Sequence, residues 1–318
     1  MSFEIVGYGR AVPALAVDND AMAKLVDTSD EWIVQRTGIS FRRAVSTETA
    51  EGLAIEAAQM ALDESGLDPA QLDLIIVSTV SGEYLTPSLS CLVQRGIGAA
   101  CPAVDINAAC VGFVYALDMA GAYFDSGRAE TVLVVSCEIM TRHVDWRDRS
   151  TCVLFGDGAG AVVLRRGEGL LSVHLTAHGD DKLLTIPAAK ASSPFDKLEH
   201  TSAPMLQMLG AEVYKFAVNA MVSDTHAVLE KAGVKIQEVA RFVPHQANAR
   251  MIQSAAKSLG FTDEQVAINI DRYGNTSSAS IPILLSELHD AGHINPGDLI
   301  VLSAFGGGLC SGAALIKI

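Results

Sequence analysis

The sequence predicts an α/β fold built from two copies of one unit. Short runs rich in β-branched residues, such as 72–80, 130–138 and 298–305, alternate with helical stretches such as 50–65 and 247–259. This alternation is typical of α/β proteins whose strands are mainly buried. Of the 318 residues, 49% are hydrophobic and only 19% are charged, which is enough apolar material for a large core.

An internal repeat indicates the duplication. Residues 61–78 align with residues 228–245, so that Gly66 matches Gly233. Both segments have the pattern of a helix, a glycine stop, a loop and a buried strand. The chain therefore contains the same helix and strand pair twice.

A glycine-rich segment near the end of each half extends the repeat. The segments FGDGAGAVVL (155–164) and FGGGLCSGAALI (305–316) each predict a strand, a glycine-rich turn and a returning strand. The chain accordingly divides near residue 167 into an N-terminal half, 1–167, and a C-terminal half, 168–318. Equivalent loops of a duplicated fold face each other, so a composite site is expected between the halves.

Charge and composition exclude several classes of protein. The net charge of −14 argues against nucleic acid or an anionic membrane as a general partner. The uncharged run 299–316 contains three consecutive glycines, which favour two buried strands over a membrane helix. The first residues lack a basic region followed by an apolar run, so we expect no secretory signal and a cytoplasmic protein.

No metal site or disulfide framework is expected. The six cysteines include no CxxC pair and are expected to be reduced thiols. Two histidine pairs have the spacing i, i+4, namely His174 with His178 and His289 with His293. Neither pair has a nearby cysteine or an HExxH pattern, which favours surface or capping histidines.

Cys110 is the first candidate for chemistry. It precedes residues 111–124, a helix that is apolar on almost every face and therefore expected to be buried. The free N–H groups and dipole of a helix start can lower a cysteine pKa from about 8.5 to roughly 3.5–7.5. The small residues Ala108, Ala109 and Gly112 would permit a tight turn and leave room for a substrate. A buried structural cysteine fits the same position equally well.

Other candidates come from both halves. His245 follows a predicted strand, where it can act as a base or donate a hydrogen bond to a developing oxyanion. Asn275 precedes a run of small residues and offers a neutral N–H donor, although a turn or helix-cap role fits as well. Trp32 beside Arg36 can stack on a base and neutralise phosphate, or can simply be a core tryptophan.

Taken together, Cys110, His245 and Asn275 resemble the active site of the β-ketoacyl-acyl carrier protein synthase III family, condensing enzymes of the thiolase-like fold. The resemblance runs end to end through TSDEWIVQRTGI, DINAACVGF, RSTCVLFGDGAGAVV, VPHQANARMI, DRYGNTSSAS and AFGGG. Elongating condensing enzymes use two histidines with the cysteine, whereas Asn275 resembles the initiating class. The resemblance implies a duplicated five-layer αβαβα fold, usually a homodimer, that needs no cofactor.

The resemblance also implies a ping-pong reaction, the initiation step of type II fatty acid biosynthesis. Cys110 would take an acyl group from acyl-CoA, and decarboxylation of malonyl-acyl carrier protein would supply the carbanion that attacks it. The products would be 3-oxoacyl-acyl carrier protein, CoA and CO2. His245 and Asn275 would stabilise the enolate, and the backbone N–H groups of Cys110 and Gly306 would form the oxyanion hole.

Binding residues follow from the same resemblance. Trp32 and Arg149 would sandwich the CoA adenine. The implied CoA-binding residues are Thr28, Trp32, Arg36, Arg149 and Asn248; the acyl carrier protein-binding residues are Lys215, Arg250 and Lys257; the acyl pocket contains Thr86 and Phe155. Three local cations could orient an acidic carrier protein although the whole chain is acidic.

Two positions depart from the family pattern. Ala211 stands where the family often has an asparagine that binds pantetheine. Thr86 stands where many members have a phenylalanine that reaches across the dimer into the acyl pocket, so space for a primer longer than acetyl is a hypothesis.

Three other functions are compatible with the sequence to different degrees. A condensing enzyme of a specialised pathway would keep the chemistry and change the primer or acceptor. A cysteine thioester hydrolase would use Cys110 and release free acid. A non-catalytic partner subunit would be expected to lack the nucleophile, which is present here.

Overall fold

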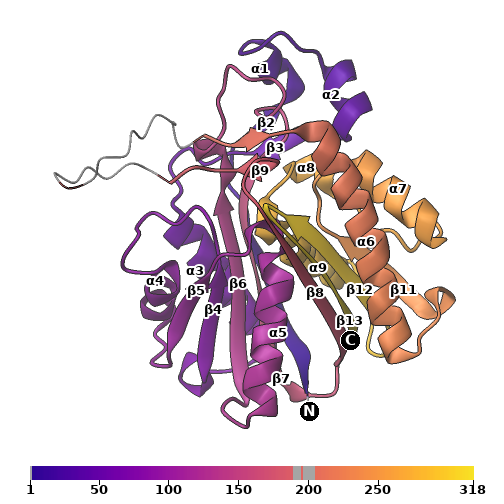
Figure 1. Ribbon diagram of the computed structural model, residues 1–318. Helices are drawn as coiled ribbons and strands as arrows, with labels where there is room; N and C mark the ends of the chain where they lie inside the picture. Colours follow the sequence, from indigo (N-terminus) through magenta and orange to yellow (C-terminus); the bar gives the residue numbers. More distant parts are fainter. Residues whose placement is uncertain (1, 189–194, 196–204) are drawn as a thin grey trace.

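The structure is a computed structural model that describes residues 2–188, 195 and 205–318 (Figure 1). Its two main sheets come from the two predicted halves. The first contains β1 (Ser2–Ala11), β4 (Leu74–Ser78), β5 (Ala103–Ile106), β6 (Thr131–Ile139) and β7 (Asp157–Gly167). The second contains β8 (Leu170–Asp180), β11 (Val239–Pro244), β12 (Leu299–Gly306) and β13 (Gly308–Lys317). The predicted division near residue 167 falls between β7 and β8.

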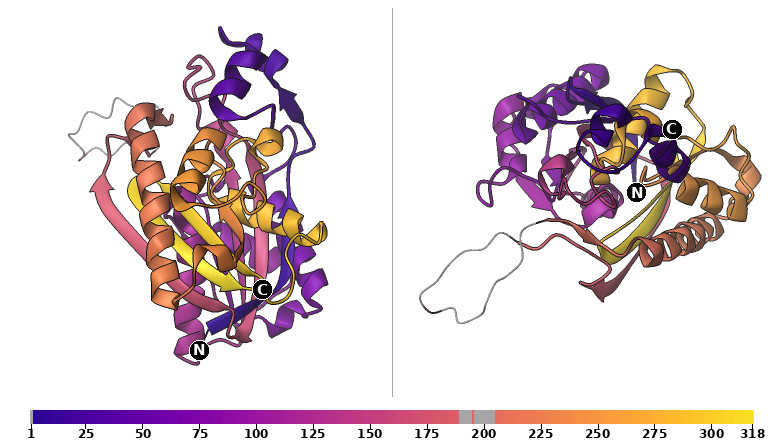
Figure 2. Two further views of the ribbon diagram at one scale, coloured as in Figure 1. Left: turned by 90° about the vertical axis from the view of Figure 1, so that its right-hand side faces the viewer. Right: turned by 90° about the horizontal axis from the view of Figure 1, so that it is seen from above.

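Helices complete a five-layer αβαβα arrangement. The outer layers are α3 (Ala50–Ser65) with α4 (Leu89–Ile97), and α6 (Gly210–Ala232) with α7 (Ala249–Leu259). The central layer is α5 (Gly112–Asp125) with α9 (Ser280–Asp290) (Figure 2). Smaller elements are α1 (Asn19–Ala23), α2 (Asp30–Thr37), α8 (Ile270–Tyr273), β2 (Ala16–Asp18), β3 (Phe41–Arg43), β9 (Leu184–Thr185) and β10 (Gln207–Met208). The predicted α/β fold is confirmed.

Strand order reveals the duplication directly. The first sheet has the order β1-β7-β6-β4-β5 and the second β8-β13-β12-β11. In each sheet the first two neighbouring pairs are antiparallel and the next pair is parallel. An isolated parallel bridge between Phe242 and Val266 stands where β5 would be expected in the second sheet. The aligned helices α3 and α6 both end at a left-handed glycine, Gly66 with φ 68° and Gly233 with φ 67°.

The glycine-rich segments differ between the halves. The second joins β12 to β13 through Gly307, as predicted. The first was predicted to begin with a strand, and this is wrong, because residues 140–156 form a long connection between β6 and β7. Phe155 pairs instead with Asn275 of the other half, and the N–H of Gly156 donates to the Asn275 carbonyl at 3.0 Å. The segment therefore ties the halves together.

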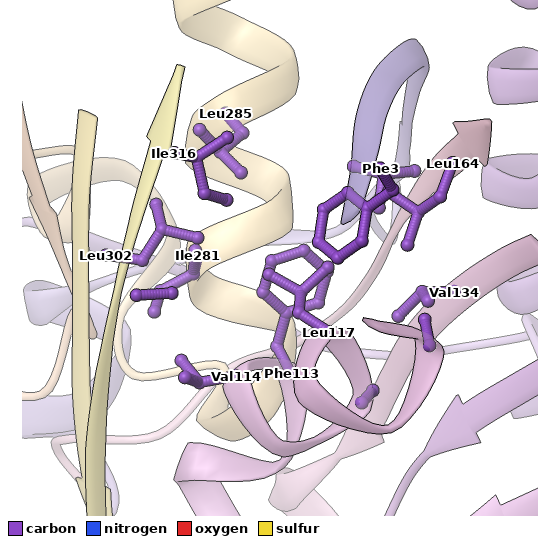
Figure 3. Packing of buried hydrophobic residues seen from close by; sticks show 14 of the residues in the cluster. Phe3, Phe113, Val114, Leu117, Val134, Leu164, Ile281, Leu285, Leu302 and Ile316 are labelled. Carbon is purple, nitrogen blue, oxygen red and sulfur yellow. The ribbon is translucent and has the colours of Figure 1, made fainter. Parts of the chain in front are cut away.

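The central layer is held by side chains from both sheets. Figure 3 shows Phe113 and Leu117 of α5 packed among residues of the two halves. Val134 of β6 and Leu302 of β12 point into this layer, whereas their neighbours along each strand face the outer helices. This alternation follows from the two-residue period of a strand that is covered on both faces. Burial on all sides fixes where α5 begins.

The uncharged run 299–316 forms β12 and β13, which confirms the prediction of two strands. Within the described part of the chain, no helix is long and apolar enough to cross a membrane. The described residues also contain no group of three or more His, Cys, Asp or Glu side chains that could hold a metal ion. His289 Nε2 contacts Glu64 Oε1, and the His289 ring stacks on the Tyr8 ring at 4.4 Å between centroids.

Gly112 allows α5 to start in contact with β4, because a Cβ there would overlap the Ser78 hydroxyl. We expect Gly112→Ala to lower the free energy of unfolding by about 1–3 kcal/mol, since the helix start must shift. Gly121→Ala in the same helix is the control: its nearest heavy atom would lie 3.4 Å away. That variant should be neutral or more stable by up to about 1 kcal/mol. Urea unfolding measures both, and equal effects would contradict the close approach.

Candidate active site

A cavity of about 1290 Å³ is lined by residues of both halves. Cys110 and Phe155 come from the first half, and His245, Asn275 and Phe305 from the second. The three predicted catalytic residues therefore share one cavity, although 165 positions separate the first from the last.

Cys110 lies in a tight turn and not in α5 itself. The turn is the 3-10 segment η2 (Ala109–Val111), and α5 begins after it, at Gly112. Ala109 has a φ of 48°, a conformation uncommon for residues other than glycine. A Cβ at Gly306 would lie 2.7 Å from the Cys110 nitrogen, so the two backbones are in close contact. Gly112 permits the contact between α5 and β4. It does not line the cavity, so the prediction that it leaves room for a substrate is wrong.

Burial raises the pKa of Cys110 to about 12. The hydrogen bond from Ser277 opposes this shift, and the nearby Glu138 charge adds to it. The prediction that the pKa of Cys110 is lowered is wrong. The loss of hydration on burial outweighs the electrostatic effect of the helix N-terminus, because α5 begins after Cys110. Without substrate the side chain is therefore a protonated thiol at neutral pH, and its proton must leave when the sulfur reacts.

His245 is fixed at the end of β11. Its backbone N–H donates to the Ser303 carbonyl at 2.8 Å, and its ring meets Phe305 edge-on at 5.4 Å between centroids. Only 1% of the residue is exposed, and burial lowers its pKa to about 3. The imidazole is consequently neutral at physiological pH.

Ser280 orients the His245 ring, because its hydroxyl lies 2.7 Å from Nδ1. The same oxygen accepts the N–H of Gln246 at 3.3 Å, and its own proton can be donated to Nδ1 in the tautomer that has its proton on Nε2. Nε2 then carries the ring proton and is available as a donor. The sequence pattern had not singled out Ser280, which lies five residues after Asn275.

The side-chain oxygen of Asn275 already accepts a hydrogen bond within the protein. Its Oδ1 accepts the N–H of Ser277 at 2.9 Å. Its backbone bonds to Leu154 and Gly156 of the first half at 2.8 and 3.0 Å. With Oδ1 occupied, Nδ2 remains as a neutral donor, which is the chemistry expected of this residue.

Glu138 is a buried acid that was not among the residues expected from the sequence. It lies in β6 with no exposed surface. Its Oε2 accepts from the Val80 N–H at 3.1 Å and the Ser81 hydroxyl at 2.7 Å, and its Oε1 accepts from the Ser278 hydroxyl at 2.7 Å. Burial raises its pKa to about 7 despite these donors. A glutamate inside the apolar run TVLVVSCEI was the available signal.

The predicted adenine site is closed in this structure. The Arg149 guanidinium lies 5.0 Å from the centre of the Trp32 ring, and that of Arg36 lies 5.5 Å away. A base between Trp32 and Arg149 needs about 7 Å, twice the usual contact separation. Arg149 donates to the Asp27 carbonyl at 2.7 Å, so a base can enter only if Arg149 moves.

The other two predicted CoA contacts have different positions. Asn248 lines the cavity and caps α7, with Oδ1 accepting the Arg250 N–H at 2.9 Å and Nδ2 donating to the Arg36 carbonyl at 3.1 Å. One amide proton of Asn248 is left for a ligand. Thr28 does not line the cavity, and its buried hydroxyl has no partner among the described residues.

The predicted carrier protein residues are all exposed and lie on two adjacent helices. Lys215 belongs to α6, and Arg250 and Lys257 belong to α7. Arg250 also lines the cavity. Arg250 and Lys257 are seven residues apart and therefore share one face of α7. Tyr214 joins the helices by donating to the Arg250 carbonyl at 3.3 Å.

The two predicted acyl-pocket residues are separated. Phe155 lines the cavity and is 4% exposed. Thr86 is exposed and does not line the cavity of its own chain, whereas its neighbour Leu85 does. Ala211, the other departure from the family pattern, lines the cavity without a side-chain polar group.

Comparison with known proteins assigns the family. Models described as 3-oxoacyl-[acyl-carrier-protein] synthase III and as its C-terminal part match residues 104–179 and 229–318. A β-ketoacyl-[acyl-carrier-protein] synthase III from Clostridium acetobutylicum is 44% identical over 99% of this chain and 98% of its own. The chain belongs to the synthase III family. This membership confirms the resemblance inferred from the sequence motifs.

Solved structures agree with the synthase III assignment. The crystal structure of 3-oxoacyl-[acyl-carrier-protein] synthase III from Aquifex aeolicus has a TM-score of 0.93 and 45% identity, with 100% of both chains covered. A priming β-ketosynthase from the R1128 polyketide biosynthetic pathway also has a TM-score of 0.93, with 34% identity and coverage of 100% of this chain and 96% of its own. Both the fold and the condensing-enzyme class are thereby established.

The neutral state of His245 gives a testable dependence of stability on pH. The folded chain protonates this imidazole near pH 3, whereas an unfolded chain does so near pH 6.5. Between these values the unfolded state binds more protons, so the stability that is present above pH 6.5 is lost as the pH falls. His245 alone should cost about 2 kcal/mol of unfolding free energy between pH 7 and pH 5.

Urea unfolding at both pH values measures this loss. The variant His245→Asn serves as the comparison and should lack this part of the loss. Identical losses in the two proteins would contradict a buried neutral imidazole.

Proposed function

We propose that this chain initiates fatty acid synthesis by joining an acyl-CoA primer to malonyl-acyl carrier protein, with release of CoA and CO2 and formation of 3-oxoacyl-acyl carrier protein. The observation that carries the proposal is the meeting of Cys110, His245 and Asn275 in one cavity. Relatives that are 44% and 46% identical over almost the whole chain bear the name β-ketoacyl-[acyl-carrier-protein] synthase III.

In the first half-reaction, Cys110 Sγ attacks the thioester carbonyl of acyl-CoA and the CoA sulfur leaves. The backbone N–H groups of Cys110 and Gly306 are the proposed donors to the oxyanion that forms. The close approach of Gly306 to the Cys110 nitrogen supports this pairing.

In the second half-reaction, the malonyl group loses CO2 and its thioester oxygen becomes enolate-like. His245 Nε2 and Asn275 Nδ2 are the proposed donors to that oxygen. Two neutral donors in a buried site stabilise the developing charge without first giving up a proton. The low pKa of His245 supports donation by neutral imidazole.

Two separate groups of residues are proposed to bind the two substrates. Trp32, Arg36, Arg149 and Asn248 would contact CoA after Arg149 moves away from the Trp32 ring. Lys215, Arg250 and Lys257 would receive the acidic carrier protein. We further propose a cytoplasmic homodimer without a cofactor; β5 supports dimerisation because it is an edge strand of its sheet.

The proposal has two candidates for the chain length of the acyl primer. By the family resemblance Thr86 stands where many members have a phenylalanine, and a priming enzyme of a polyketide pathway is among the similar structures. A specialised primer longer than acetyl is therefore the second candidate. Rates of acyl-enzyme formation with acetyl-CoA and with C6 to C12 acyl-CoA separate the two, because a large preference for acetyl rejects the longer primer.

Three variants separate the two half-reactions. Cys110→Ser should abolish acylation, because the nucleophile is lost. His245→Ala and Asn275→Ala should still form the acyl-enzyme but lose malonyl decarboxylation by at least about 100-fold, since each removes one enolate donor. Intact mass reports the acylated protein, and release of labelled CO2 reports decarboxylation.

Two outcomes of this experiment would reject the proposal. Normal condensation by Cys110→Ser would exclude the nucleophile. Rapid appearance of free acid from acyl-CoA without malonyl-acyl carrier protein would favour a thioester hydrolase.

Charge reversal tests the proposed docking surface. Lys257→Glu should raise the KM for malonyl-acyl carrier protein about tenfold at low ionic strength with little change in kcat, and added salt should reduce the difference. The KM for acyl-CoA should stay the same. Lys235→Glu is the matched control, because Lys235 is also exposed but lies beyond the far end of α6. Equal effects of the two variants would reject a local docking site.

A further inference from the structure

Ser277 connects the nucleophile to a buried acid. Its hydroxyl lies 3.3 Å from Cys110 Sγ and 3.3 Å from Glu138 Oε1. The three groups come from three separate elements, η2, β6 and the 3-10 segment η5 (Ser277–Ala279). A hydroxyl has one proton and can accept another hydrogen bond, so Ser277 can bond to both neighbours at once.

Two proton arrangements fit the same heavy atoms. In the first, the Cys110 thiol donates to Ser277 Oγ and Ser277 donates to an ionised Glu138. In the second, a protonated Glu138 donates to Ser277 Oγ and Ser277 donates to a Cys110 thiolate. Each bond reverses between the two arrangements, and no heavy atom has to change partners.

We propose that Glu138 accepts the proton of Cys110 through Ser277 when the thiol attacks acyl-CoA. The inference rests on the proposed role of Cys110 as the acylated residue. It adds a proton acceptor to the first half-reaction, whereas His245 and Asn275 serve the second.

The step balances without another reactant. As the bond from Cys110 Sγ to the acyl carbon forms, the thiol proton passes to Ser277 Oγ and the Ser277 proton passes to Glu138 Oε1. The bond from the acyl carbon to the CoA sulfur then breaks, and its electron pair leaves on that sulfur. The proton held by Glu138 finally returns through Ser277 Oγ, which lines the cavity, to the CoA thiolate, so that CoA leaves as the thiol and the carboxylate is restored.

His245 is the weaker proton acceptor of the two. Its Nδ1 is engaged by Ser280, and burial lowers its pKa to about 3. Burial raises the pKa of Glu138 to about 7, which is suited to gaining and losing a proton near neutral pH. A base with the higher pKa captures the thiol proton more readily.

The titratable groups near Glu138 are compatible with its role as the acceptor of the Cys110 proton. Cys110 faces it from η2, and Cys137 is its neighbour on β6. Cys137 donates to the Ala50 carbonyl at 3.3 Å and its pKa is raised well above its usual value, so it stays a neutral thiol. The charged groups that act on Cys137 from the other side are Asp157, Glu83 and Arg142.

Single-turnover acylation of the full-length chain by acyl-CoA, followed by intact mass from pH 5.5 to 8.5, tests the relay. The unaltered chain should show a rate that rises through a step near pH 7. Glu138→Gln should lose the step and be at least about 100-fold slower at pH 8. Ser277→Ala should behave in the same way, because it interrupts the path while the other donors to Glu138 remain.

Ser278→Ala is the matched variant, since Ser278 bonds to Glu138 and belongs to the same turn as Ser277. Its hydrogen bond lowers the pKa of Glu138, so its loss should move the step to higher pH without removing it. This comparison also decides the matter if Glu138→Gln fails to fold. Equal profiles for Ser277→Ala and Ser278→Ala would overturn the relay.

Binding of acyl-CoA distinguishes a lost base from a damaged site. Glu138 does not line the cavity, so Glu138→Gln should bind acyl-CoA with a Kd within threefold of that of the unaltered chain. Slow acylation with undiminished binding supports the relay. A loss of binding as large as the loss of acylation, or acylation within threefold of normal with the same pH profile, overturns it. If the unaltered chain itself is not acylated at Cys110, the proposed function fails instead.

Discussion

The active site depends on two strained turns that open the two central helices. Ala109 with φ 48° precedes α5, and Ser277 with φ 52° precedes α9. Such conformations cost of order 1–3 kcal/mol each and persist only when the surroundings fix them. Here the packing of both helices between two sheets supplies that support, so the turns hold Cys110 and Asn275 on a common cavity wall.

The same burial sets the protonation states of the site. It lowers the pKa of His245 to about 3 and raises those of Cys110 and Glu138 to about 12 and about 7. Burial of these groups therefore provides neutral donors for an enolate but also leaves a thiol that does not ionise by itself. Burial is therefore the physical cause both of the rigid geometry of the site and of the need for a proton acceptor.

The sequence predicted those structural elements that depend on local hydrophobic periodicity and residue spacing. The buried helix after Cys110 and the strand pair at 299–316 follow from apolar runs and glycine stops, whereas the five-layer arrangement was implied by the resemblance to the synthase III family. The roles of Glu138 and Ser277 could not be predicted, because they depend on contacts between residues 139 positions apart. The direction of the Cys110 shift was wrong for the same reason, since burial is a tertiary property.

The duplication explains why an asparagine lies where it does. The segments NAACVG (107–112) and NTSSAS (275–280) are equivalent turns, and each asparagine Oδ1 accepts the N–H of the residue two positions later. Cys110 in the first turn corresponds to Ser278 in the second, which anchors Glu138. One copy of the turn thus carries the nucleophile, and the other carries an amide donor and the hydroxyls around the buried acid. Because the two copies of the turn contact each other where the two central helices begin, side-chain differences between the copies place the nucleophile of one half and the donors of the other in the same cavity.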